Sequence, residues 1–303
     1  MPIIGECRSA HCASAGLLQT LIVVCGPTAS GKTSKSIEIA KAIGGEIICA
    51  DSMQIYKNLP IVTASPTYAE KKEVPHHLFN FVELTENWTV TKYVELAHKK
   101  IAEIAANNKI PILVGGTGLY IDSVANNRNF INIDVASDIA LNLQNKSNEE
   151  LFKILLEVDK LSSEKIPMAN RRRLIRALEI YYATGRTKTE IDSLSQMSPK
   201  YDTIYIGTYF EKSELYNRIN ERTNIMVKNG LLEEIEKTYN IPLGKTSMQA
   251  IGCKELFPYF SGEISLNEAI EKIKQRTRNY AKRQMTWFAR NKKIIWVKQK
   301  KYY

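Results

Sequence analysis

The chain has 303 residues, of which 44% are hydrophobic and 24% charged, and its formal net charge at pH 7 is +10. This composition is typical of a soluble protein that folds as one large domain or as a core with a smaller insert. No apolar run reaches the roughly 20 residues of a membrane helix and no basic secretory leader opens the chain, so we expect a cytoplasmic protein outside the membrane.

The cysteines favour neither a disulfide framework nor a zinc site. Their number is odd, they are scattered, and no CxxC pair occurs, so we expect reduced thiols. Cys7, His11 and Cys12 lie close together, but no second half of a zinc motif follows them. The alternative to a metal site here is a loose tail, and residues 1–19 are expected to be a disordered extension.

Strand and helix patterns alternate over the first part of the chain. An apolar run over 21–26 predicts a buried strand, residues 32–43 predict a helix, and the run EIICAD predicts a second strand that ends on Asp51. A helix is predicted over 89–108, and a third strand, KIPILVGGT, ends in glycines and a threonine. This alternation is typical of an α/β fold with a parallel sheet, where ligands bind at the carboxyl ends of the strands.

The middle of the chain lacks a buried strand pattern. Helical periodicity over 147–166 and 170–191 predicts a helical insertion domain at 128–202. Beyond it, the patterns predict a strand over 201–210, helices over 213–239 and 265–291, and a short strand over 293–298. The predicted domains are a first core part (20–127), the insert (128–202) and a second core part with basic C-terminal helices (203–303).

Positive charge is concentrated near the C-terminal end. Residues 271–303 contain 12 Lys or Arg and one acidic residue. A basic surface of this kind suits a polyanion, of which nucleic acid is the leading candidate, while the alternative is a solvated helix face.

Residues 26–33, GPTASGKT, match the phosphate-loop pattern G-x-x-x-x-G-K-[ST] between a predicted strand and helix. Backbone N–H groups of such a loop bind phosphate oxygens, Lys32 supplies a cation, and Thr33 supplies a hydroxyl for Mg²⁺. An NTPase also needs an acidic residue at the end of another strand, and the third strand has none. The residues therefore favour a polyphosphate site without nucleotide hydrolysis, with Asp51 as a candidate general base or, alternatively, a turn residue.

Seven motifs, in this order and spacing over 21–297, resemble those of bacterial tRNA dimethylallyltransferases. They are GPTASGKT (26–33), ADSMQIYK (50–57), VPHHL (74–78), GGTGLYI (115–121), RALEIYYATGR (176–186), SMQAIGCKE (247–255) and TRNYAKRQMTWF (277–288).

The resemblance implies a P-loop NTPase-like core with a helical insertion domain that binds tRNA. It implies transfer of a dimethylallyl group from dimethylallyl diphosphate to N6 of the adenine 3′ of the anticodon, in tRNAs that read codons beginning with U. The implied partners are the anticodon stem-loop and the diphosphate donor, the implied cofactor is Mg²⁺, and a monomer is expected.

The resemblance also assigns roles to residues. Asp51 would accept the N6 proton, and Lys32, Arg278 and a Mg²⁺ ion on Thr33 would stabilise the departing pyrophosphate. The diphosphate-binding loop would comprise Gly26, Pro27, Thr28, Ala29, Ser30, Gly31, Lys32 and Thr33. The tRNA-binding residues would be Asp51, Ser52, Met53, Gln54, Thr117, Arg172, Arg173, Leu174, Ile175 and Arg176, the first four around a flipped-out adenine.

Several other conspicuous residues are assigned no functional role. His76 and His77 are assigned no catalytic role, and Trp287 and Phe288 are expected in the core. Ser65 replaces a lysine common in the resembled family. Two other functions remain open at this point: a P-loop kinase of a small molecule or polynucleotide, which the glycines of the third strand disfavour, and a non-catalytic RNA-binding module.

Overall fold

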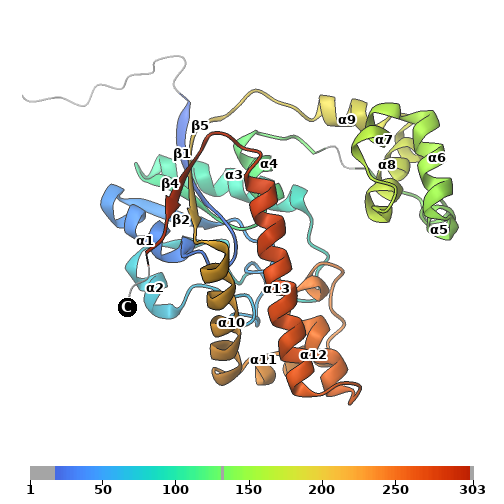
Figure 1. The fold of residues 1–303 in the computed structure, drawn as a ribbon. Coiled ribbons are helices and arrows are strands. Elements are labelled where there is room, and N and C mark those ends of the chain that lie inside the picture. Colours follow the sequence, from blue (N-terminus) through green and yellow to red (C-terminus); the bar gives the residue numbers. More distant parts are fainter. Residues whose placement is uncertain (1–17, 131–132, 301–303) are drawn as a thin grey trace, which may run out of the picture.

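A single parallel sheet runs through the computed structural model, which describes residues 18–130 and 133–300. In these residues the strands lie in the order β3-β2-β4-β1-β5-β6, and every neighbouring pair is parallel (Figure 1). They are β1 (Gln19–Cys25), β2 (Gly45–Cys49), β3 (His76–His77), β4 (Ile110–Gly115), β5 (Tyr201–Tyr209) and β6 (Ile294–Lys298). The predicted parallel α/β fold is confirmed, and β3 is an addition that the sequence patterns did not predict.

Helices cover both faces of the central strands. Leu21 and Val23 of β1 pack with α3 (Val90–Ala106), α4 (Gly118–Ala125) and the end of α13 (Leu266–Phe288), whereas Ile22 and Val24 pack with α1 (Lys32–Ile43). Because successive side chains of a strand point to opposite faces, burial of both faces requires a continuous apolar run. This is why the strand patterns were visible in the sequence.

Three predicted helices are each divided into two. The pairs are α6 (Asn148–Val158) and α7 (Lys160–Lys165), α8 (Arg171–Thr184) and α9 (Lys188–Leu194), and α10 (Lys212–Lys228) and α11 (Leu231–Tyr239). Gly185 and Gly230 separate two of the pairs with φ of 68° and 97°, in the left-handed region that ends a helix. Asp159 separates the third, and its carboxylate accepts a hydrogen bond from the backbone N–H of Ser162 at 3.0 Å.

Helices α5 (Ser137–Asn145), α6 and α8 pack around a core of their own, in which Leu143, Leu155 and Leu178 are buried, and α7 and α9 contact α6 and α8. Figure 1 shows this helical group beside the sheet. Strand β5 begins at Tyr201, so the last two residues of the range predicted for the insert belong to the sheet.

A second buried cluster joins the chain that follows β2 to the C-terminal half. Tyr56 and Leu59 pack there with Leu231 of α11, Leu256 of α12 (Cys253–Phe260) and Ile273 of α13. Two shorter elements complete the described structure: α2 (Tyr68–Glu73) and a 3-10 turn (Ser247–Gln249). This cluster brings α10 and α13 to the carboxyl ends of the strands.

Part of the predicted N-terminal extension can be compared with the structure. Residues 1–17, with Cys7, His11 and Cys12, lie outside the described residues, whereas Gln19 is the first residue of β1. Cys25, Cys49 and Cys253 are buried free thiols. None of the described helices combines the length and the apolar character needed to cross a membrane.

Candidate active site

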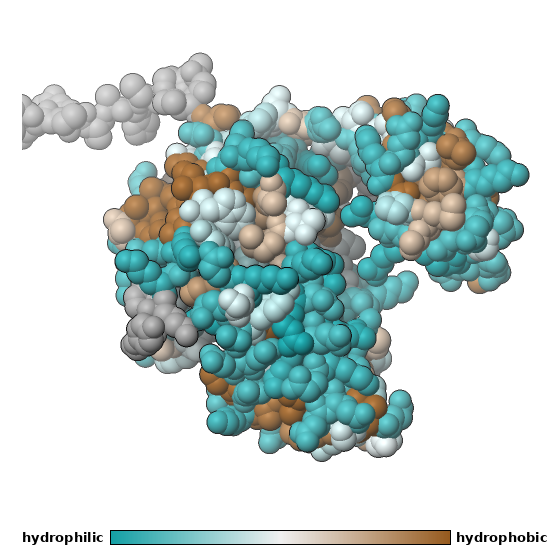
Figure 2. Space-filling view, viewed as in Figure 1, coloured by the Kyte–Doolittle hydropathy of each residue, from teal (hydrophilic) through white to brown (hydrophobic). Residues whose placement is uncertain are grey.

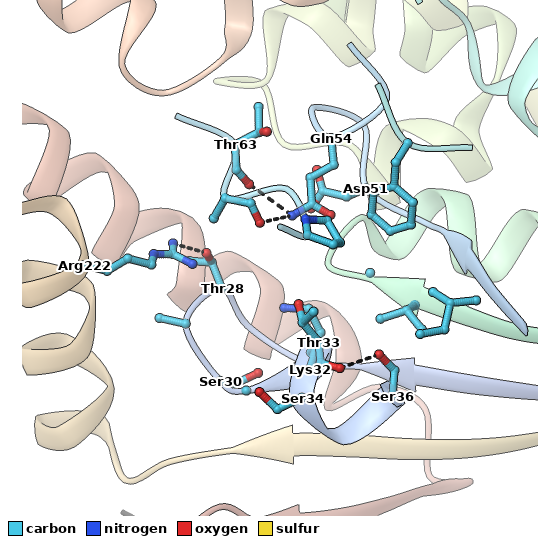
Figure 3. A pocket seen from close by; sticks show the side chains of 18 of the residues that line it. Thr28, Ser30, Lys32, Thr33, Ser34, Ser36, Asp51, Gln54, Thr63 and Arg222 are labelled. Carbon is cyan, nitrogen blue, oxygen red and sulfur yellow. Dashed lines mark hydrogen bonds between the residues drawn. The ribbon is translucent and has the colours of Figure 1, made fainter. Parts of the chain in front are cut away.

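The loop of residues 26–31 connects β1 to α1 and is held against β5 (Figure 3). A Cβ on Gly26 (φ 140°) would lie 2.4 Å from the carbonyl oxygen of Thr208, so this position requires glycine. Ser30 Oγ lies 2.7 Å from Thr208 Oγ1, and Gly31 precedes α1 with a φ of 82°. The backbone N–H groups at the start of α1 therefore form a fixed anion site.

Two arginines of α10 hold the other side of this loop. Arg218 Nε donates to the carbonyl oxygen of Ala29 at 3.1 Å, and Arg222 Nη2 donates to Thr28 Oγ1 at 2.5 Å. Sequence reasoning did not select these arginines. Their spacing of four residues, on one face of the helix predicted after the fourth core strand, was the available signal.

Lys32 lies at the centre of this basic site. Its Nζ donates to the carbonyl oxygen of Pro27 at 2.7 Å. Burial disfavours the ammonium form and lowers the pKa of Lys32 to about 8; nearby Asp51 opposes this shift and Arg222 adds to it. A bound polyphosphate would restore the charged form, because it brings negative charge to the ammonium group.

Two cavities meet at the carboxyl ends of the strands. The phosphate-loop cavity, about 410 Å³, is lined by residues of the loop and by Arg218, with apolar Ile47, Phe79 and Val114 in its wall. The α13 cavity, about 330 Å³, is lined by Ser52, Met53, Tyr280 and Arg283, among others. Thr28, Asp51, Thr63 and Arg222 line both cavities.

Asp51 stands at this junction, two residues beyond the end of β2. Its Oδ1 accepts a hydrogen bond from the backbone N–H of Met53 at 2.9 Å. Beside it, the backbone N–H of Ser52 donates to Thr117 Oγ1 at 2.9 Å, and the Thr117 hydroxyl donates to Ser52 Oγ at 3.2 Å. The loops that follow β2 and β4 are thereby joined next to the Asp51 carboxylate.

Gln54 supports the wall of the phosphate-loop cavity. Its Nε2 donates to the carbonyl oxygens of Thr63 and Ala64 at 3.0 and 2.8 Å. The carboxylate of Glu234 in α11 accepts from the backbone N–H groups of the two residues before Thr63, each at 2.8 Å. Ser65, in place of the family lysine, lies 3.0 Å from the hydroxyl of Thr63.

Arg278 is not brought to the phosphate loop. Its Nη1 donates to Asn220 Oδ1 on α10 at 2.6 Å, and it lines neither of the two cavities. The guanidinium groups that line the phosphate-loop cavity are those of Arg218 and Arg222. The predicted contact of Arg278 with the diphosphate therefore has no geometric support, because Arg278 packs against α10 instead.

The predicted tRNA-binding stretch Arg172–Arg176 divides into two faces of α8. Arg172 lines the α13 cavity, and Arg173 and Arg176 are exposed. Leu174 is fully buried in the core of the insert, so the prediction that its side chain contacts tRNA is corrected, whereas Ile175 is partly buried against that core and its contact with tRNA stays a prediction. A fully buried side chain has no surface to offer RNA.

The residues interpreted as structural have structural contacts. His76 Nδ1 lies 2.8 Å from the carbonyl oxygen of Val74, and His77 Nε2 lies 2.6 Å from Glu46 Oε2. Phe288 is buried in the core, and Trp287 Nε1 donates to Asp122 at 2.8 Å. His76 also lines the phosphate-loop cavity, where burial lowers its pKa and thus favours the neutral form of its ring.

Comparison with known proteins gives one consistent family. Residues 54–292 match the family model described as IPP transferase. The chain is 45% identical over 285 residues to a tRNA dimethylallyltransferase of Bacillus pumilus, covering 92% of this chain and 89% of the relative. A second tRNA dimethylallyltransferase, from Anoxybacillus flavithermus, is 43% identical over 279 residues, covering 92% and 90%.

Solved structures agree with these relatives. The full-length tRNA isopentenylpyrophosphate transferase of Bacillus halodurans superposes with a TM-score of 0.70 at 37% identity, covering 92% of this chain and 90% of that one. A eukaryotic dimethylallyltransferase, described as acting on tRNA, superposes with a TM-score of 0.80 at 30% identity, covering 92% and 74%.

Proposed function

The chain belongs to the IPP transferase family, and from this membership we propose that it transfers a dimethylallyl group from dimethylallyl diphosphate to N6 of an adenine in tRNA. The acceptor is the adenine 3′ of the anticodon, in tRNAs that read codons beginning with U. The observation that carries this proposal is the position of Asp51, a carboxylate at the junction of a phosphate-binding cavity and a second cavity.

The phosphate-loop cavity suits the donor. Its loop N–H groups, Lys32 and Arg222 match a diphosphate, and the apolar side chains of Phe79 and Val114 suit a short prenyl chain. The α13 cavity suits the acceptor, since a base extruded from the anticodon loop can enter beside Ser52 and Met53. Arg172, which reaches this cavity from the insert, suits the RNA backbone.

The reaction follows from this arrangement. The adenine N6 attacks the allylic carbon of the donor, the C–N bond forms, and the C–O bond to the diphosphate breaks. The Asp51 carboxylate accepts the N6 proton, and Lys32 and Arg222 stabilise the negative charge that develops on the departing pyrophosphate. Thr117, held by Ser52, lies beside the same point.

The residues present fit a Mg²⁺ ion that takes most of its ligands from the donor. The described residues contain no group of three or more His, Cys, Asp or Glu side chains that could hold a metal by themselves. Mg²⁺ commonly binds through one or two protein oxygens together with substrate phosphates and water. Thr33 would hold such an ion, which would supply further charge neutralisation to the diphosphate.

The test is a transfer assay. The purified protein is given an unmodified anticodon stem-loop RNA with isotopically labelled dimethylallyl diphosphate, and in parallel with ATP labelled in its γ-phosphate. We expect prenyl label in the RNA, at the target adenine only. Transfer of phosphate without prenyl label would favour a kinase, and RNA binding without either transfer would favour a non-catalytic RNA-binding module.

A further inference from the structure

We propose that Gln284 is a positioning residue that sets the distance between the phosphate loop and the loop that follows β4. The inference rests on the proposed prenyl transfer, because these two loops would carry the leaving group and the acceptor side of the reaction. Gln284 lies on α13, which passes close to the carboxyl ends of the strands (Figure 1). Gln284 lies within the motif of residues 277–288, but the sequence analysis assigned no role to it.

One side chain joins the two loops. Gln284 Oε1 accepts a hydrogen bond from the backbone N–H of Thr28 at 2.8 Å, and its Nε2 donates to the carbonyl oxygen of Gly116 at 2.9 Å. The side chain is 4% exposed, so water does not replace either bond easily. Thr28 and Gly116 follow the neighbouring strands β1 and β4, and Gln284 therefore links the carboxyl ends of both.

The carboxamide of Gln284 meets both requirements at neutral pH, whereas the side chains of Met and ionised Glu, which are of similar size, do not. The Thr28 N–H needs an acceptor and the Gly116 carbonyl needs a donor, and an amide offers one of each. A methionine offers neither in comparable strength. An ionised glutamate offers the acceptor but places a negatively charged oxygen, which cannot donate, against the Gly116 carbonyl oxygen.

The glycines that end β4 make room for this contact. A Cβ on Gly116 would lie 2.1 Å from Gln284 Nε2 and 3.5 Å from Asp51 Oδ2. A Cβ on the preceding residue, Gly115, would lie 2.0 Å from the carbonyl oxygen of Ala50. The absence of side chains here thus allows Gln284 and Asp51 to converge on one short stretch of backbone.

Thr28 and Gly116, the two partners of Gln284, are each connected to residues that would face the substrates. On one side, Thr28 receives the hydrogen bond of Arg222 on its hydroxyl. On the other side, Thr117 follows Gly116 and binds Ser52 next to Asp51. Displacing either loop would change the separation of the diphosphate cradle and the carboxylate that accepts the proton, and a misplacement of about 1 Å can cost roughly 10²-fold in rate.

The first test compares Gln284→Met with Gln275→Met, an exposed glutamine on the same helix. We expect Gln284→Met to lower kcat about 10- to 100-fold while KM for the stem-loop and for the donor changes less than about threefold. Gln275→Met is expected to keep the wild-type kcat. Equal kcat of Gln284→Met and wild type, or a loss that resides in KM alone, would overturn the positioning role.

The second test uses Gln284→Glu and remains informative if the methionine variant folds poorly. A protonated carboxyl at 284 can accept from Thr28 and donate to Gly116, as the amide does, whereas the ionised form cannot. The ratio of the kcat of Gln284→Glu to that of wild type should therefore rise as the pH is lowered. A ratio that stays constant with pH would contradict the inference. A wild-type protein without any prenyl transfer would instead contradict the proposed function, and the inference with it.

Discussion

The guanidinium of Arg222 donates a hydrogen bond to the hydroxyl of Thr28 at 2.5 Å, so a helix 194 residues further along the chain reaches into the phosphate loop. Arg222 lines both cavities, and burial lowers its pKa to about 10, which leaves it charged at neutral pH. It therefore meets the requirements for stabilising a pyrophosphate leaving group, the role that the sequence motifs assigned to Arg278.

Matched substitutions distinguish the roles of Arg222 and Arg278. We expect Arg222→Gln to lower the rate of a single turnover roughly 10²-fold, because one charge that stabilises the leaving group is lost. Arg278→Gln removes a hydrogen bond to Asn220 outside the cavities and should change that rate less than about threefold. Rapid-quench measurement with labelled dimethylallyl diphosphate gives both rates, and the reverse order would restore the original assignment to Arg278.

Asp51 is tested by removal of its carboxylate. Asp51→Ala should lower turnover roughly 10²-fold or more, because the N6 proton loses its acceptor. The affinity for the stem-loop, measured by fluorescence anisotropy, should stay close to that of wild type. A variant with full turnover would mean that Asp51 serves only as a turn residue, through the bond that its Oδ1 accepts from Met53.

The lowered pKa of Lys32 predicts that pyrophosphate binding depends on pH. Its pKa in the free protein is lowered to about 8, so the ammonium form is fully present only below that pH. The affinity for inorganic pyrophosphate should therefore fall as the pH rises above about 8, since binding must then include uptake of a proton. Lys32→Arg keeps a charge throughout this range and should remove that fall. Isothermal titration calorimetry at several pH values measures the affinity for pyrophosphate. The same pH dependence of this affinity in wild type and in Lys32→Arg would argue against a lowered pKa of Lys32.

The exposed arginines of α8 predict a salt dependence of RNA binding. Arg172→Ala combined with Arg176→Ala should weaken binding to the stem-loop and reduce the slope of log K against log salt by about 1 to 2, since up to two phosphate contacts are lost. Lys153→Ala removes an exposed charge on α6 and serves as the control. Unchanged slopes would show that these arginines are only solvated, as an exposed charged face normally is.

The surface offers a broader basis for RNA binding than α8 alone. Lys272, Arg276, Lys282 and Arg283 are exposed on α13, and Figure 2 shows a mainly hydrophilic surface over that helix. Arg283 of α13 and Arg172 of α8 both line the α13 cavity, so a basic residue reaches it from each of two parts of the chain. The α13 part of the basic C-terminal segment, noticed from charge alone, thus lies next to the site.

Local sequence patterns predicted the strands and helices whose signals come from residues close together in the chain. The apolar runs of β1 and β4 are visible because both faces of these strands are buried. Helix α3 begins after Thr89, whose hydroxyl accepts from the backbone N–H three residues on. Two of the divided helices were missed because a glycine within a helical period does not by itself show that its φ is positive, and the third because Asp159 does not interrupt the helical period.

The sequence by itself determined the parallel α/β class, the phosphate loop and the family, because strand burial, loop conformation and motif spacing are properties of contiguous residues. Only the tertiary structure decided which arginine reaches Thr28, that Leu174 faces the core of the insert, and that Gln284 joins the loops after β1 and β4. Each of these depends on the packing of α8, α10 or α13 against segments distant in sequence. Periodicity assigns a residue to a face of its own helix, but the partner of that face is set by contacts that form only when the whole chain folds.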